Sequence, residues 1–345
     1  MVSLRRRIHY KVCQRVLLAI GLLLLPATAV AVQGNWQSFP LRNQNPFLQI
    51  FGLPAFQSAT LTAEGAPAYD VSLDIANHAD DGSNPGEDFV IDGESYFLTL
   101  SSRRRLANGV ELGIDVPLIA HQHGFLDNAI EGWHDTFGMS NTKRRGPANQ
   151  LYFAYAGDGV VDYRLNSPSF GIGDIQLTAA MPIRERANDG DFDVALRASI
   201  KLPTGDAEKL LGSGAADLSL GAYVANTGML WKRPLRVSGF LGALILGDGD
   251  VLTEIQRTTV PYGGIAATWR ATERLAIATQ LSAQGAYYDS ALKELGGDSL
   301  QLAVGGYYRL RDRGASLGFA IVEDVSANAT PDFALHVSLR IDGGR

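Results

Sequence analysis

The sequence has almost no cysteine and, beyond its first 30 residues, no long apolar run. Its one cysteine, Cys13, precedes the N-terminal apolar stretch, whereas the lipid-modified cysteine of a lipoprotein would follow it. The rest of the chain has no thiol, which excludes disulfides and thiolate chemistry there. A membrane helix needs about 18 apolar residues, and no later segment has them. If this chain spans a membrane, it does so as a closed β-barrel, because lipid leaves no backbone group unsatisfied.

Basic residues are also few, with 30 Lys and Arg against 36 Asp and Glu. Five of the basic residues precede an apolar core, Val16 to Leu25, and small residues follow it up to Ala31. This pattern predicts a cleaved secretory signal peptide over residues 1–31 and therefore export. Cleavage would remove those five basic residues and no acidic one, taking the formal charge from −6 to −11. A chain this acidic is a poor nucleic-acid binder, so we expect no nucleic-acid partner.

Long runs that alternate apolar and polar residues dominate the remainder of the chain. In one of them, Phe192 to Leu202, every second side chain is apolar. Strands of about 9–11 residues are long enough to cross a bilayer at a tilt, whereas ordinary strands have about 5–6. Such runs are predicted at 69–77, 94–106, 110–120, 174–184, 192–202, 217–224, 233–246, 260–271, 274–287, 299–310, 315–323 and 332–341. The predicted fold is all-β: a transmembrane antiparallel β-barrel of about 12 strands. A soluble secreted β-protein is the alternative.

Two segments interrupt this pattern. Residues 32–66 are rich in turns and aromatics, and we expect a periplasmic segment that packs on or inside the barrel. The barrel domain then spans residues 67–345. Within it, residues 119–169 form a predicted long loop, with a short amphipathic helix between 124 and 139. Aromatic residues near strand ends suit girdles at the membrane interfaces, although core packing gives similar patterns: Tyr262, Trp269, Tyr287, Tyr288, Tyr307, Tyr308 and Phe319.

The long loop contains the densest set of groups with metal-binding chemistry. The set comprises His121, His123, Asp127, Glu131, His134 and Asp135. Imidazoles in a His-x-His pair suit zinc, copper or iron. A bundle-type metal site needs several helices, however, and one is predicted here. The favoured interpretation is a polar loop without metal. A hydrolase is also disfavoured, because no Gly-x-Ser-x-Gly motif is present and Ser213 reads as a turn residue. We therefore expect no enzyme and no cofactor.

The polar face of the strands is the best candidate for function. Arg197 and Lys201 have the inward phase, as do Asp174, Arg184, Asp193, Asp217, Gln280, Gln284, Gln301, Arg309, His336 and Arg340. Mixed charges and amides can line an aqueous channel, which predicts a passive pore or small-solute transporter. The alternative is a structural or plugged barrel without transport. Facing the lumen, Arg197 should tolerate replacement by Leu, whereas Leu196 on the lipid face should not tolerate Arg.

Several motifs together resemble a known family. They are Asn45-Pro46-Phe47, Phe51-Gly52-Leu53-Pro54, Asn77-His78, Asp92-Gly93-Glu94, His121 to Asp127, Glu131 to His134, Lys201 to Gly205, and Gly212-Ser213-Gly214. The sequence is similar to uncharacterised Gram-negative outer-membrane proteins with a domain of unknown function. This resemblance covers nearly the whole chain after the signal peptide. It implies an outer-membrane barrel, with membrane lipid and the barrel-insertion machinery as partners, but no catalytic residue.

Overall fold

The computed structural model describes residues 38–124, 150–185, 192–226, 228–230, 233–310, 314–325, 329–331 and 333–342. The predicted signal peptide and the loop helix expected between 124 and 139 lie outside these ranges, except for Gly124. None of the helices within them has the length and apolar character needed to cross a bilayer.

Twelve antiparallel strands close into a barrel. They are β1 (Pro67–Ser83), β2 (Glu87–Arg105), β3 (Glu111–Gln122), β7 (Gln176–Arg184), β8 (Phe192–Lys201), β9 (Asp217–Asn226), β10 (Leu235–Ile245), β11 (Thr259–Arg270), β12 (Leu275–Gln284), β13 (Ser299–Arg309), β14 (Ala315–Asp324) and β15 (Phe333–Asp342). Each pairs with the next, and β1 also pairs with β15 from Ala68↔Asp342 to Asn77↔Phe333. This confirms the predicted fold class and strand number.

Three further strands lie outside the ring. β4 (Tyr152–Gly157) pairs with the loop-side end of β2, β5 (Val160–Leu165) pairs with β4, and β6 (Ser169–Ile172) pairs with β3. The long loop predicted over residues 119–169 contains strand structure that the sequence did not indicate, because β3 continues to Gln122 and β4 and β5 follow in the described part. These strands are too short for the alternation criterion to detect.

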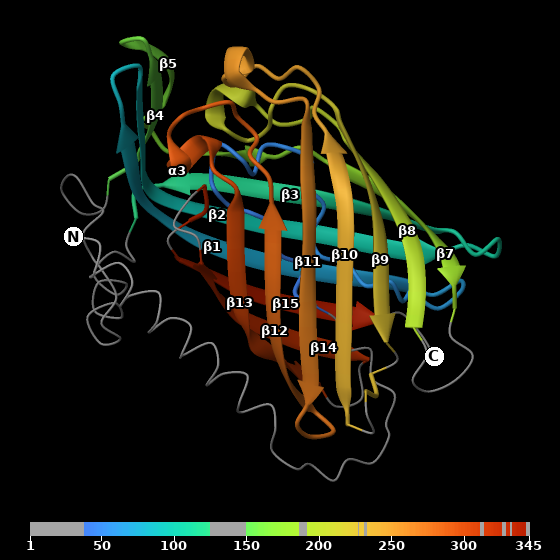
Figure 1. Cartoon of the computed structure of the whole chain (residues 1–345). Helices are drawn as coiled ribbons and strands as arrows, with labels where there is room; N and C mark the ends of the chain where they lie inside the picture. The colour runs from blue at the N-terminus through green and yellow to red at the C-terminus, as the bar shows by residue number, and fades with distance from the viewer. Residues whose placement is uncertain are drawn as a thin grey trace.

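The two ends of the barrel differ, as Figure 1 shows. One end, here called the turn end, carries both ends of the strand ring, and it is where the chain passes from β2 to β3, β7 to β8, β9 to β10, β11 to β12 and β13 to β14. The other end, the loop end, carries β4 to β6, the 3-10 turns η1 (Ala207–Lys209) and η2 (Thr253–Ile255), and the short helix α3 (Lys293–Gly296). Short turns at one end and long loops at the other are typical of outer-membrane barrels.

The two faces of the wall have opposite character. Large apolar side chains are exposed on the outside, among them Leu196, Ile200 and Leu220. Of the twelve residues predicted to point inward, nine are buried, Arg309 and Arg340 are partly buried, and Arg184 is exposed at the end of β7. The expected aromatic girdle was partly wrong. Tyr262, Tyr287, Tyr288 and Tyr307 are buried inside, where they pack against one another and the N-terminal segment.

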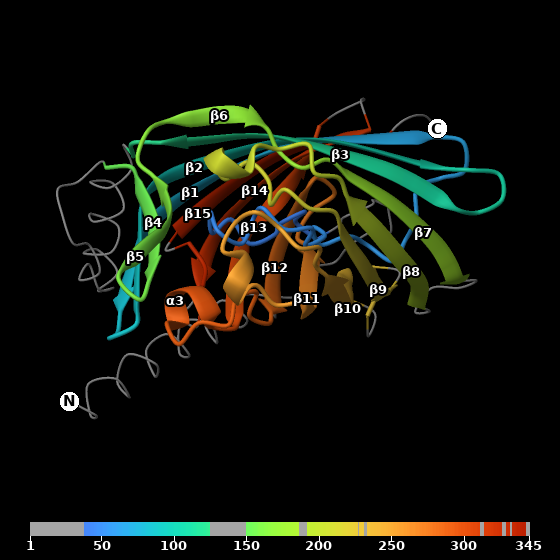
Figure 2. The same ribbon diagram turned by 90° about the horizontal axis from the view of Figure 1, so that it is seen from above.

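Residues 38–66 fill much of the lumen as a U-shaped segment, here called the hairpin, drawn in blue in Figure 2. Followed backward from β1, the hairpin begins at the turn end, where the Gly65 N–H donates to the carbonyl of Arg105. Its rising arm leads to a tip at residues 45–52, near the loop end. Its returning arm leads back toward the turn end at Ser38, whose hydroxyl lies 2.9 Å from that of Ser238. The tip buries Phe47, Ile50 and Phe51 among aromatic and aliphatic side chains of the loop end.

Candidate functional site

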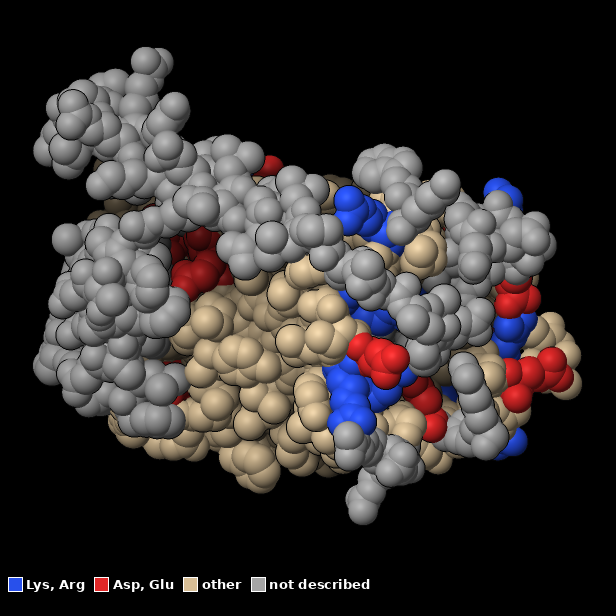
Figure 3. Space-filling model, turned by 90° about the horizontal axis from the view of Figure 1, so that it is seen from below, with Lys and Arg blue, Asp and Glu red and all other residues tan. Residues whose placement is uncertain are grey.

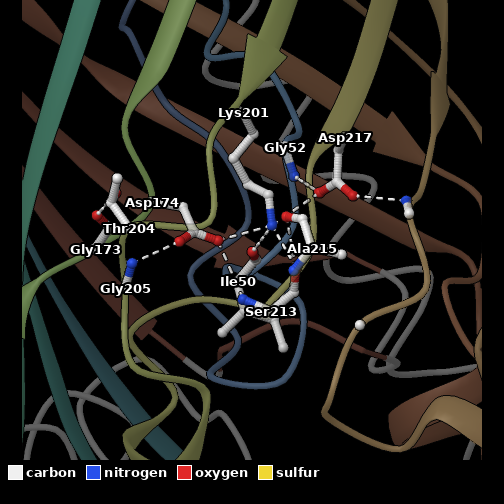
Figure 4. A network of polar contacts seen from close by, with 12 residues as sticks. Ile50, Gly52, Gly173, Asp174, Lys201, Thr204, Gly205, Ser213, Ala215 and Asp217 are labelled. Atoms are coloured by element: carbon white, nitrogen blue, oxygen red, sulfur yellow. Dashed lines mark hydrogen bonds and ion pairs between the residues drawn. The ribbon is translucent and has the colours of Figure 1, made fainter.

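The hairpin tip is fixed to the wall by a buried lysine (Figure 4). Lys201, at the loop-side end of β8, places its ammonium 2.7 Å from Asp174 Oδ2 and 3.1 Å from Asp217 Oδ2. The same ammonium donates to the Ile50 carbonyl at 3.0 Å and to the Ser213 hydroxyl. Because it is committed to two carboxylates and a carbonyl, it is not placed to act as a base for Ser213.

Backbone donors complete this group, which we call the latch: Ile50, Gly52, Asp174, Lys201, Ser213 and Asp217. The Gly52 N–H donates to Asp217 at 2.8 Å, and the Gly247 N–H donates to the other oxygen of that carboxylate at 3.0 Å. Asp174 accepts from Gly205 and Ser213. One cation and two carboxylates leave an excess negative charge, which these N–H dipoles stabilise. The latch therefore joins the hairpin tip to β8, β9 and two loops.

A second group fixes the rising arm of the hairpin nearer the turn end. Arg197 donates to the Ser58 carbonyl at 2.6 and 3.0 Å, to Gln57 at 2.8 Å, and to Glu111 at 2.9 Å. Glu111 in turn accepts from the Thr62 N–H at 2.6 Å. Arg197 thus forms a buried ion pair with Glu111. We therefore expect replacement of Arg197 by Leu to be destabilising, in place of the tolerance expected from the sequence.

The returning arm packs on the opposite wall. Phe39 stacks on Tyr307 with ring centroids 4.9 Å apart, and its edge meets the His336 ring at 5.8 Å. His336 Nδ1 lies 2.7 Å from Asp74 Oδ1 across the seam between β1 and β15. This contact ties the returning arm to the pair of strands that closes the barrel.

A cavity of about 110 Å³ runs between the hairpin and one side of the wall. On that side β2, β1, β15 and β14 line it with small hydroxyl side chains: Ser72, Thr99, Ser101, Ser316 and Ser338. Ser72 pairs with both Thr99 and Ser338, so these hydroxyls form a continuous strip. Since small side chains leave space that the hairpin does not fill, the cavity extends from the turn-end residues Asp70 and Arg340 up to the latch residues Asp174 and Lys201.

The predicted histidine and acidic set is only partly described. His121 is fully buried on β3, and His123 is exposed just after that strand. Asp127, Glu131, His134 and Asp135 lie outside the described residues. His121 Nε2 lies 3.1 Å from the Leu210 carbonyl, which means that this nitrogen donates. Within the described ranges, no group of three or more His, Cys, Asp or Glu side chains is arranged to hold a metal ion.

A serine between two imidazoles lies beside His121. Ser95 Oγ is 2.8 Å from His121 Nδ1 and 2.9 Å from His78 Nε2. Because His121 Nε2 donates to a carbonyl, its Nδ1 accepts, so Ser95 donates to it and accepts from His78. All three side chains are fully buried. No substrate can reach this hydroxyl, so the arrangement is structural and connects β1, β2 and β3 to the loop at Leu210.

Titratable groups at the two ends, outside the membrane-spanning part of the barrel, have shifted pKa values. At the loop end, burial raises the pKa of Tyr163, whose hydroxyl donates to the Glu208 carbonyl at 2.7 Å. At the turn end, basic and acidic side chains lie next to one another (Figure 3). There Arg105 binds both oxygens of Glu185 at 2.5 and 2.8 Å, and this hydrogen bonding lowers the pKa of that carboxyl.

The alternation of apolar and polar residues along the strands was enough to identify four inward-facing residues that the structure brings together with the hairpin: Asp174, Arg197, Lys201 and Asp217. Arg42, Gln44 and Asp115 were missed. Asp115 follows the same alternation along β3 and was detectable by it. Arg42 is a single charge in a turn-rich segment, and nothing in its local sequence indicates that it enters the lumen.

Comparisons with known proteins are consistent with this architecture. A model of a family described as a protein of unknown function, DUF3187, matches residues 12–342. Among solved structures, the chain is similar to the COG4313 outer membrane channel from Pseudomonas putida F1, with a TM-score of 0.55 and 14% identity over 83% of this chain and 99% of that one. This likeness shows that the fold is that of an outer-membrane barrel.

Two more solved structures have lower scores. The NanC porin has a TM-score of 0.44 and 7% identity over 79% of this chain and 98% of its own. The toluene transporter TodX of Pseudomonas putida has a TM-score of 0.42 and 11% identity over 89% and 100%. The three neighbours are a channel, a porin and a transporter. No curated protein matches the sequence.

Proposed function

Since the chain belongs to the DUF3187 family, whose function is unknown, we propose its function from the lumen: it is a passive outer-membrane pore for small polar solutes, gated by the hairpin. It reaches the membrane after removal of residues 1–31, and the insertion machinery folds it there. Its exposed apolar side chains contact membrane lipid. Because the short turns of outer-membrane barrels lie on the periplasmic side, the turn end faces the periplasm.

The observation that supports this proposal is the polar cavity between the hairpin and the hydroxyl strip of β2, β1, β15 and β14. A barrel built only for mechanical purposes has no need to keep a polar space along its length, because closely packed interiors are more stable. The hairpin closes this space at the loop end, where its tip is buried. Displacement of the tip would connect the cavity to the loop end.

A reversible lock tests this gating. The Ser38 and Ser238 side chains face each other with their hydroxyl oxygens 2.9 Å apart, so the sulfurs of cysteines at these positions would lie next to one another. The exported chain has no native thiol to interfere. We expect planar-bilayer conductance of Ser38→Cys/Ser238→Cys to be suppressed when oxidised and restored by reductant. Each single-cysteine variant serves as a control and should not respond.

Removal of the hairpin gives the complementary measurement. A variant lacking residues 38–62, shown to fold by its shift in gel mobility on heating, should conduct continuously and at a higher level than the full chain. If the full chain, the reduced lock variant and the deletion variant all stay closed to every solute, the protein is a structural barrel and the pore proposal fails.

A further inference from the structure

Building on the proposed pore, we propose that the lumen cavity is a binding site for a small monocarboxylate that carries a hydroxyl or amino group. Its polar contacts are Arg42 and Gln44 of the hairpin and Gln176 of β7. All three residues line the same cavity.

Arg42 is the cation that the fold leaves without a bonded partner. Four other basic side chains line the cavity, and each has an acidic partner: Arg103 with Asp115, Arg197 with Glu111, Lys201 with Asp174 and Asp217, and Arg340 with Asp342. Among the described residues, Arg42 makes no hydrogen bond or ion pair. It also lines a second cavity of about 20 Å³ on the other side of the returning arm. A guanidinium inside a barrel without a bonded anion is costly, so an anionic ligand would stabilise it.

The carboxylates near Arg42 are bound elsewhere. Asp74 and Asp115 exert an electrostatic influence on Arg42. Asp74, however, accepts from His336 at 2.7 Å, and both oxygens of Asp115 accept from Arg103 at 2.8 Å. The negative charge of Asp74 and Asp115 disfavours a multiply charged anion in the same space. This favours a singly charged carboxylate over phosphate, and a planar carboxylate matches the two parallel N–H donors of a guanidinium.

Two amides supply the complementary groups. Neither amide atom of Gln44 has a hydrogen-bond partner among the described residues, although only 1% of this residue is exposed. Gln176 donates to the Leu53 carbonyl at 3.4 Å, but its Oε1 accepts from no described residue. Buried amides are normally satisfied, so each exception needs an explanation. These amide atoms are enclosed in this structure, so a ligand in the cavity reaches them after a rotation of the side chain. The Gln44 NH₂ can then donate to a carboxylate, whereas the two amide oxygens need a donor. A hydroxyl or amino group beside the carboxylate provides one.

The size of the cavity limits the ligand. One water occupies about 10–15 Å³ on this measure, so 110 Å³ accommodates about seven to eleven waters. A solute of comparable size has a similar number of non-hydrogen atoms. Three-carbon acids have five or six non-hydrogen atoms, so they fit within this space and leave room for a few waters. They form a matched series: propionate has only the carboxylate, lactate adds a hydroxyl, and alanine adds an amino group.

Titration calorimetry of the refolded, full-length exported chain in detergent tests the site. The probes are propionate, lactate, alanine and inorganic phosphate, each used separately. We expect lactate or alanine to bind at least about fivefold more tightly than propionate, as one additional net hydrogen bond gives. Phosphate should bind more weakly than the better of these two. Whichever of lactate and alanine binds better identifies the donor. Equal binding of all carboxylates, or heat only with phosphate, would overturn the proposal.

Matched variants locate the binding. Arg42→Gln should abolish carboxylate binding, while Arg104→Gln, at an exposed position on the same side of the barrel, should leave it unchanged. Gln44→Met should weaken binding and, because it removes an unsatisfied amide, raise the midpoint of thermal unfolding of the unliganded protein. A structural role alone would lower that midpoint. Binding that survives Arg42→Gln would show that the ligand lies elsewhere.

The calorimetric test of the binding site and the conductance test of the pore can fail independently of each other. Conductance gated by the hairpin without any calorimetric binding would keep the pore and refute the binding site, leaving a cavity that holds water only. Binding abolished by Arg42→Gln in a chain that never conducts would keep the binding site and refute the pore.

Discussion

At the residue scale, Lys201 is the centre of the latch, because one ammonium contacts two carboxylates, a hydroxyl and the Ile50 carbonyl of the hairpin tip. Lys201→Met would leave Asp174 and Asp217 buried without their cation. Removing one partner of a buried pair costs about 3–5 kcal/mol. We expect a loss of that size in urea unfolding of the refolded protein, together with more frequent opening in bilayers.

A surface lysine provides the control for this variant. Lys209 pairs with Asp206 at 2.6 Å on the loop end, where both side chains are exposed. Exposed pairs contribute little because water and salt screen them. Lys209→Met should therefore leave both unfolding and gating unchanged. Equal losses in the two lysine variants would contradict the role given to the latch.

Neighbouring residues on β8 test the two faces of the wall. Leu196 is 38% exposed on the outer face, and Arg at a lipid-facing midplane position costs about 2–4 kcal/mol. Arg197→Leu should cost about 3–5 kcal/mol, because it strands the buried Glu111 and releases Ser58. Urea unfolding in lipid vesicles compares the two. A small loss in Arg197→Leu would restore the simpler interpretation of Arg197 as a lumen-lining charge.

Sequence alone predicted these residues only up to a point. A period of two places Arg197 and Lys201 on the inner face of β8, and this part is confirmed. Their partners cannot be read from the same pattern. Glu111 and Ser58 are 86 and 139 residues away from Arg197, and only the closed ring and the hairpin bring them together. The pattern thus specifies which way a side chain points, whereas its partner depends on the tertiary fold.

At the element scale, the hairpin lies so close to β8 and β9 that no side chain fits between them at Gly52. A Cβ there would be 2.9 Å from Asp217 Cβ and 3.0 Å from Lys201 Cβ. Both atoms are attached directly to the wall backbone and cannot swing aside. Gly52→Ala should therefore push the tip off the wall, lower stability by about 1–3 kcal/mol as overpacking does, and increase bilayer conductance.

Gly86, in the short turn between β1 and β2, is the comparison. A Cβ at this position has its nearest neighbour at 3.7 Å, which is ordinary contact. Gly86→Ala should conduct and unfold like the unmodified protein. If Gly52→Ala also does so, the hairpin tip tolerates displacement without opening a path.

Strands were far more predictable than the hairpin. The twelve ring strands begin and end within a few residues of the predicted ranges, except β1 and β2, which continue past the apolar alternation into polar residues such as Asp80 and Asp92. An outward apolar row is a local property and therefore visible in sequence. The hairpin has no repeating pattern. Its U shape arises from separate contacts with eight or more strands and loops, and none of these leaves a periodic trace.

For the whole molecule, the closed ring with an apolar exterior predicts behaviour that a soluble protein does not share. We expect the expressed chain to fractionate with the outer membrane, to require detergent for extraction, and to migrate faster on a gel when it is not heated. Full recovery in the soluble periplasmic fraction without detergent would contradict the membrane barrel.

The seam between β1 and β15 has a consequence for the order of folding. Ala68 pairs with Asp342, so 274 residues must be brought end to end to close the ring. Such a closure costs about 5 kcal/mol of chain entropy, and each halving of the effective loop lowers it by about 0.6 kcal/mol. The contact between Ser38 and Ser238, once made, leaves 104 residues from Ser238 to Asp342 and 30 from Ser38 to Ala68, which is about half of the original loop. Once this contact has been made, closure of the seam costs about 0.6 kcal/mol less chain entropy, so the segment that fills the lumen of the finished barrel also holds the first strand near the second half of the ring.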